Sequence, residues 1–101
     1  DAAKNDGATP LFMAVQEGHD DMAKLLLAHG AAVDAAKNDG LTPLFMASQN
    51  GHDDMAKLLL AHGAAVDAAE NDGDAPLHMA SQNGHDDMAK LLLAHGAAVD
   101  A

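Results

Sequence analysis

The sequence predicts an all-α protein in which short helices stack as repeated units, and two observations support this prediction. First, Ala, Leu and Met dominate the hydrophobic residues, which make up 49% of the chain, and these three types lose little rotamer freedom in a helix. The β-branched residues, by contrast, amount to four Val and two Thr, which excludes an all-β domain. Second, the chain repeats itself every 33 residues, as stacked repeat proteins do.

The repeats follow one another without a gap. Residues 1–33, 34–66 and 67–99 align with one another, and 27 of the 33 positions are identical in all three copies. Residues 100–101 begin a fourth unit, so we expect residues 1–101 to form a single array rather than several domains. The positions that vary are Lys4/Lys37/Glu70, Ala8/Leu41/Asp74, Thr9/Thr42/Ala75, Phe12/Phe45/His78, Val15/Ser48/Ser81 and Glu17/Asn50/Asn83.

Each repeat begins with a turn and a short helix, as the first copy illustrates. The run Asn5-Asp6-Gly7 predicts a turn, because Asn and Gly tolerate a positive φ. Thr9 is suited to the N-cap and Pro10 to the first helical position, where its missing N–H costs nothing. We expect this helix to run from Pro10 to about Glu17 and to end at Gly18.

A second helix is expected from Asp20-Asp21 to His29, with Gly30 just beyond its end. Neither helix reaches the roughly 12 to 15 residues that an isolated helix needs in water, so each unit must be covered by its neighbour. The apolar faces expected to be buried are Leu11, Ala14 and Val15 in the first helix and Met22, Leu25 and Leu26 in the second. The methionines of every repeat are likewise expected in the core: Met13, Met46, Met79, Met22, Met55 and Met88.

These residues resemble the ankyrin repeat along the whole chain. The resemblance rests on Gly7-x-Thr9-Pro10-Leu11-x-x-Ala14, on Gly18-His19, on Leu25-Leu26-Leu27-x-x-Gly30-Ala31, and on the same positions 33 and 66 residues later. It implies antiparallel helix pairs stacked in an L-shaped solenoid, with hairpin-like loops that project nearly at right angles. It also implies that the protein binds other proteins through the loop tips and the exposed side of the first helices.

The chain departs from the family pattern in the Thr-Pro-Leu-His box. The first two repeats read Thr-Pro-Leu-Phe and the third reads Ala75-Pro76-Leu77-His78, so the hydrogen bond between that Thr and that His cannot form in any repeat. The third repeat also loses its hydroxyl cap, at a cost of about 1 kcal/mol. Second helices of the family usually carry two β-branched residues where this chain has Met22-Ala23, which predicts looser packing.

The ends of the array also depart from the family, whose arrays normally close with polar capping repeats. The second helix is the same string in all three units, so we expect Leu91 and Leu92 to have no covering neighbour within the chain. Glu70, Asp74 and His78 make the last unit a partial cap at best. We expect the ends to stack head to tail on neighbouring chains, through a heterologous contact that can propagate as a filament.

The residues that could carry chemistry are better explained by structural roles. The run His19-Asp20-Asp21 and its copies, about 9 Å apart, cannot complete a four-ligand metal site; instead, Gly-His orders the turn and the Asp pair caps the second helix. Ser48 and Ser81 lack the single asymmetric cleft that a catalytic triad needs. A surface row is expected at the ends of the second helices, formed by His29, His62 and His95. The sequence therefore predicts no enzyme, no bound metal and no cofactor.

The resemblance assigns protein binding to the loop tips and the ends of the first helices. By family position these are Asn5, Asp6, Ala8, Gln16, Glu17, Asn38, Asp39, Leu41, Gln49, Asn50, Asn71, Asp72, Asp74, Gln82 and Asn83. Asn-Asp and Gln recur unchanged in every repeat, and Leu41 is the sole large apolar side chain among these residues, so the face is unspecialised. Because this ridge is acidic, any partner is expected to be a protein with a basic surface.

Composition narrows the function to two hypotheses. A net charge of −11 makes nucleic acid and anionic membranes poor partners. Apolar runs are too short for a membrane span or a signal peptide, and a natural protein of this sequence is expected in the cytoplasm. In the first hypothesis the chain is an engineered or consensus-like, non-enzymatic ankyrin scaffold without an evolved ligand. In the second it is a fragment of a natural, tandemly duplicated ankyrin protein that mediates protein–protein binding.

Overall fold

The computed structural model describes residues 6–99, which fold into three pairs of helices with no strand among them. The six helices are α1 (Pro10–Gln16), α2 (Asp20–Ala28), α3 (Pro43–Asn50), α4 (Asp53–Ala61), α5 (Pro76–Gln82) and α6 (Asp86–Ala94). Both predicted helices of each repeat are present, and the predicted bounds are correct to within one residue. None of the six is long and apolar enough to cross a membrane.

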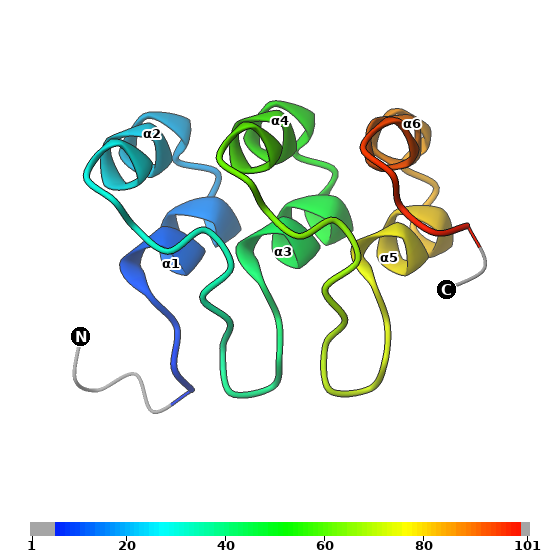
Figure 1. Ribbon diagram of the computed structural model, residues 1–101, viewed down its shortest axis with the longest axis horizontal. Coiled ribbons are helices and arrows are strands. Elements are labelled where there is room, and N and C mark those ends of the chain that lie inside the picture. Colours follow the sequence, from blue (N-terminus) through cyan, green and yellow to red (C-terminus); the bar gives the residue numbers. More distant parts are fainter. Residues whose placement is uncertain (1–5, 100–101) are drawn as a thin grey trace.

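The helix pairs stand side by side in chain order, as Figure 1 shows. One row contains α1, α3 and α5, and a second row contains α2, α4 and α6. Each first helix packs against the second helix of its own repeat and against the first helix of the adjacent repeat. Between pairs, the chain descends from the second helix to a loop tip below the first row and then returns (Figure 1). The resulting slab measures 37 × 26 × 20 Å.

The first helices begin at the caps that the sequence predicts. Thr9 Oγ1 accepts a hydrogen bond of 3.1 Å from the backbone N–H of Phe12, and Thr42 makes the equivalent bond in the second repeat. In the third repeat the backbone N–H of Ala75 donates to Nδ1 of His78 over 2.7 Å. The histidine ring thus satisfies the N–H of the N-cap residue, a contact that the sequence did not predict. The His78 N–H that a hydroxyl would cap donates instead to the Ala75 carbonyl oxygen over 3.0 Å.

The second helices begin differently from the expectation. We expected the Asp pair to cap α2, but the N-cap position is held by His19, whose side chain makes no capping bond. Asp20 and Asp21 are instead the first two residues of the helix, where their charge faces the positive end of the dipole. At the other end the C-cap is His29, and Gly30 follows with a φ of 89° as expected.

The predicted apolar face of α1 is confirmed, whereas that of α2 is wrong. Leu11, Ala14 and Val15 are buried in α1. In α2, however, Met22 and Leu25 are 49% and 53% exposed, and Leu26 is half-buried. The buried residues of α2 are Ala23 and Leu27. The physical reason is that the predicted stripe of α2 faces the side on which the described residues include no preceding repeat.

The methionines of the first and second helices are only partly in the core. Met46, Met55 and Met88 are buried, whereas Met13 and Met79 are half-buried and Met22 is exposed. The expectation for the last helix is also wrong. Leu92 is fully buried in α6 and Leu91 is half-buried, because both face the preceding repeat, while Leu93 is 44% exposed. Residues 100–101, predicted to begin a fourth unit, lie outside the described residues.

Candidate protein-binding surfaces

The projecting loops form the first candidate surface, and backbone hydrogen bonds join each loop tip to the next. The N–H of Asn38 donates to the carbonyl oxygen of Asp6 over 2.6 Å, and Asn71 donates to Asp39 over 2.9 Å. Within the second loop, Asp39 Oδ1 accepts from the N–H of Leu41 over 3.1 Å, which closes a local turn. The described parts of the three loop tips therefore form a continuous edge of the molecule.

Close packing explains the glycine at the second loop tip. Gly40 has a φ of 88°, and a Cβ added there would lie 2.8 Å from the backbone nitrogen of Asn71. In the last repeat, nothing lies within 4 Å of the corresponding position at Gly73, because the described residues place no further loop against it. The same glycine is therefore required for packing in one repeat and for its left-handed backbone alone in another.

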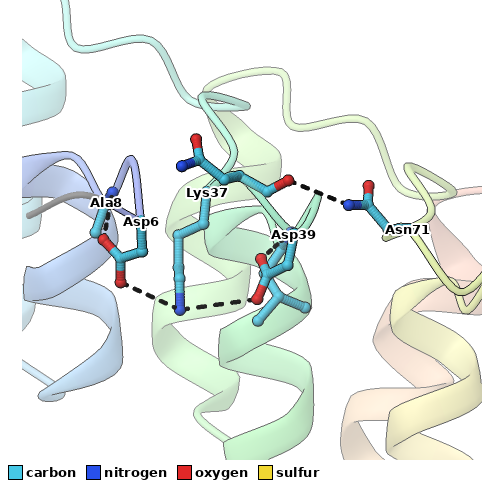
Figure 2. Close-up of polar contacts among 7 residues, drawn as sticks. Asp6, Ala8, Lys37, Asp39 and Asn71 are labelled. Atoms are coloured by element: carbon cyan, nitrogen blue, oxygen red, sulfur yellow. Dashed lines mark hydrogen bonds and ion pairs between the residues drawn. The ribbon is translucent and has the colours of Figure 1, made fainter.

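A lysine links the first two loops, as Figure 2 shows. Lys37 Nζ lies 3.6 Å from Asp6 Oδ2, 3.9 Å from Asp39 Oδ2 and 5.4 Å from the centre of the Phe12 ring. In the third repeat this position is Glu70, whose Oε1 accepts from the N–H of Asp74 over 2.9 Å. The loops of the second and third repeats consequently meet without the bridging cation, and their edge is the more acidic.

Most residues expected at the binding face are exposed. The exposed ones are Asp6, Gln16, Glu17, Asn38, Asp39, Asn50, Asn71, Asp72, Asp74, Gln82 and Asn83. Ala8, Leu41 and Gln49 are half-buried, so Leu41, the one large apolar residue of this face, packs in part against the core. Asn5 lies outside the described residues.

Several residues of this face also join neighbouring repeats, which sequence reasoning missed. Asn71 Nδ2 donates to the carbonyl oxygen of Asn38 over 3.1 Å (Figure 2). At the same junction between the second and third repeats, the carbonyl oxygen of Gln49 accepts from Asn83 Nδ2 over 3.0 Å and lies 3.1 Å from His85 Nε2. These bonds satisfy a carbonyl at the end of α3 with groups from the following repeat. The recurrence of Asn and His at fixed positions was the available signal.

The histidine and serine positions have structural surroundings. A Cβ built at Gly18 would contact the His52 ring at 3.4 Å, so the ring of one repeat lies over the turn of the repeat before it. Ser48 is buried, and its hydroxyl donates to the carbonyl oxygen of Leu44 over 2.8 Å. Among residues 6–99, no group of three or more His, Cys, Asp or Glu side chains could hold a metal ion. His29, His62 and His95 are exposed C-caps, which confirms the surface row.

The two ends of the array form the second candidate surface. At the N-terminal end, Met22 and Leu25 are exposed. A largely apolar hollow of about 240 Å³ is lined in part by Pro10 and Leu26. Here and below, the N-terminal face denotes these four residues.

At the opposite end, Leu93 and Val99 are exposed. A hollow of about 300 Å³ at this end is lined in part by Leu77, His78, Ser81 and Val99. The C-terminal face denotes Leu93, Val99 and Ser81. Each end of the array therefore has exposed apolar side chains and a hollow that residues of the same face help to line.

The architecture defines a helical repeat protein built from stacked helix pairs with projecting loops. The family model of the ankyrin repeat matches residues 6–38, and a model of three ankyrin repeat copies matches residues 32–101. The chain therefore belongs to the ankyrin repeat family, as its sequence motifs predict. Ankyrin repeats form protein-binding scaffolds that are generally not enzymes. A search of curated proteins found no significant match to this chain.

Proposed function

We propose that this chain is a non-enzymatic scaffold that associates with copies of itself through the two ends of its array. The observation that supports this proposal is the distribution of exposed apolar side chains. Within residues 6–99, the exposed large hydrophobic residues are Met22 and Leu25 at one end and Leu93 and Val99 at the other. Large apolar patches that remain exposed usually mark interaction sites, and here they are the same faces that pack between repeats inside the chain.

We further propose that the array is engineered or consensus-like and has no evolved ligand on its loop face. The support is the uniformity of that face, where Asn-Asp and Gln recur in all three repeats. Interfaces that bind tightly rely on a few Trp, Tyr or Arg anchors, and the chain contains no Trp or Tyr. A natural, recently duplicated protein remains the alternative origin, and shared codons between the repeats of its gene would support that alternative.

The experiment that tests self-association is light scattering coupled to size exclusion, run from micromolar to millimolar protein. We expect the measured mass to rise above 10.3 kDa as the concentration increases. A mass that stays at 10.3 kDa throughout would show that the ends do not associate and would turn attention to the loop face.

The acidic loop edge favours a second candidate function, which is binding of a basic protein. Asp39, Glu70 and Asp74 lie at the junction that lacks a bridging lysine, and the chain carries a net charge of −11. The test is titration with a fluorescent oligolysine peptide at about 50 and about 500 mM salt, because added salt shortens the Debye length and screens exposed charges. Binding should weaken strongly at the higher salt concentration. Affinity that is equal at both would mean that charge does not direct binding to this edge.

A further inference from the structure

The second helices provide a direct comparison, because α2, α4 and α6 have the same sequence in three different surroundings. The methionine of this string is 49% exposed as Met22 but 1% exposed as Met55 and fully buried as Met88. Pro10 follows the same rule, being exposed where Pro43 is buried. Since the residues are identical, the difference arises from the presence of a repeat on the N-terminal side.

At other positions of the repeat, the exposure of the side chain depends on the repeat that follows. Leu27 is 6% exposed, Leu60 is half-buried and Leu93 is 44% exposed, although all three occupy the same place in the string. The serine at the end of the first helix behaves alike, since Ser48 is buried and Ser81 is exposed. These positions are covered only when a repeat follows. Every repeat therefore has two different faces, and each internal junction joins one face of each kind.

We propose that the C-terminal face of one chain binds the N-terminal face of a second copy, head to tail, in the register of the internal junctions. This inference rests on the self-association proposed above and specifies its polarity. The occupant of each open face is thus another copy of this chain. Its contact continues the repeat-to-repeat packing already present between α2 and α4 and between α4 and α6.

Polar contacts between repeats favour the same polarity. Each of them joins different groups on its two sides, as when His85 of one repeat approaches the Gln49 carbonyl oxygen of the repeat before it. In a head-to-tail pair, the exposed His19 of one chain takes the place of His85, and the exposed Gln82 of the other takes the place of Gln49. A two-fold pairing of like faces would bring His19 near another His19 and would not reproduce this contact.

The proposed contact does not close on itself. A heterologous interface leaves one free face at each end of the growing assembly, so the expected product is an open linear chain of copies. Because each chain carries a net charge of −11, the copies repel one another at low salt. We therefore expect assembly to strengthen as salt is added, which is the opposite of the response expected for a basic partner on the loop edge.

The test uses two variants that each block one end without changing the charge. Met22→Gln combined with Leu25→Gln blocks the N-terminal face, and Leu93→Gln combined with Val99→Gln blocks the C-terminal face. All four side chains are exposed, so circular dichroism should show an unchanged helix content. The matched control is Ala61→Gln, an equally polar change at an exposed position of the central α4.

The expected results separate the polarity from self-association itself. Each blocked variant should stay at 10.3 kDa, their equimolar mixture should form a dimer and nothing larger, and the control should assemble like the unmodified chain. A blocked variant that dimerises alone, or a mixture that stays monomeric while the unmodified chain assembles, would overturn the head-to-tail contact. If the unmodified chain is monomeric at millimolar concentration, the proposed self-association fails as well.

Discussion

The ammonium nitrogen of Lys37 lies 3.6 Å from the carboxylate of Asp6, and this ion pair connects the loops of the first and second repeats. The lysine side chain is only 19% exposed, and its charge also lies 5.4 Å from the Phe12 ring centre. One residue thus couples a loop tip to the aromatic side chain of the neighbouring first helix. The third repeat has no such residue, because Glu70 replaces the lysine.

We expect Lys37→Met to lower the free energy of unfolding by about 0.5 to 1.5 kcal/mol, since both the ion pair and the cation–π contact are lost. Methionine keeps the apolar stem, so packing changes little. The measurement is urea denaturation followed by circular dichroism. Lys57→Met, at an exposed position of α4, is the control and should have a much smaller effect. Equal losses in the two variants would show that the loop-to-loop contact contributes nothing.

Glu70→Lys should have the opposite effect. The new lysine would take the position of Lys37 one repeat later, beside Asp39 and in an edge crowded with carboxylates. We expect a gain of about 0.5 to 1 kcal/mol in unfolding free energy after loss of the Glu70 bond to the Asp74 N–H. Glu70→Gln removes the negative charge without supplying a cation, so it separates relief of repulsion from bridging. A lysine variant no more stable than the glutamine variant would argue against the bridge.

The N-caps allow a prediction about local stability. Thr42 is buried and its Oγ1 accepts from the N–H of Phe45 over 3.1 Å. Thr42→Ala should therefore cost about 1 kcal/mol of unfolding free energy, measured by urea denaturation. The reciprocal change Ala75→Thr should give a smaller gain, because the His78 N–H that a new hydroxyl would cap already donates to the carbonyl oxygen of residue 75 over 3.0 Å. A gain at Ala75 as large as the loss at Thr42 would mean that the backbone bond of the His78 N–H has no energetic value.

Glu17 supplies a prediction about assembly. In the internal junction, Asn83 Nδ2 donates to the Gln49 carbonyl oxygen over 3.0 Å. In the proposed head-to-tail pair, Glu17 occupies the place of Asn83 and faces the Gln82 carbonyl, to which a carboxylate cannot donate. Glu17→Asn should restore this bond and lower the concentration required for assembly by about 3- to 10-fold, as one net hydrogen bond predicts.

Sedimentation velocity over a concentration series measures this shift. Glu17→Gln is the control, because it removes the same charge but has a longer side chain than the asparagine of the internal junction. If the two variants promote assembly equally, charge repulsion alone explains the effect. If neither promotes it, Glu17 does not lie in the contact, and the register taken from the internal junctions is wrong.

Local features of the fold were predictable because they depend on residues close in sequence. Thr9 and Pro10 define where a helix begins, and Gly30, with its φ of 89°, follows where one ends. The 33-residue period and the shortness of the helices together required the units to stack. The contact of the His78 ring with the Ala75 N–H was not predicted, since reasoning from the family box considered only the missing threonine.

The candidate surfaces were harder to predict from the sequence than the helices and turns. The loop residues were placed by resemblance, and most of them are exposed, but the amide of Asn83 turned out to bond across repeats. The end face was expected at Leu91 and Leu92, whereas Leu93 is the exposed residue. Helical spacing identifies an apolar stripe, but three consecutive leucines offer more than one stripe, and their spacing does not distinguish among them.

The sequence by itself determined the repeat period, the helix pairs, the threonine caps of the first helices and the acidic character of the loop edge. The tertiary structure alone decided which side of the second helices is buried. Met22 and Met55 stand in identical strings, yet one is exposed and the other is buried. Local structure depends on neighbours along the chain, whereas burial depends on neighbours in space, and a string that is repeated three times cannot encode whether another unit lies beside it.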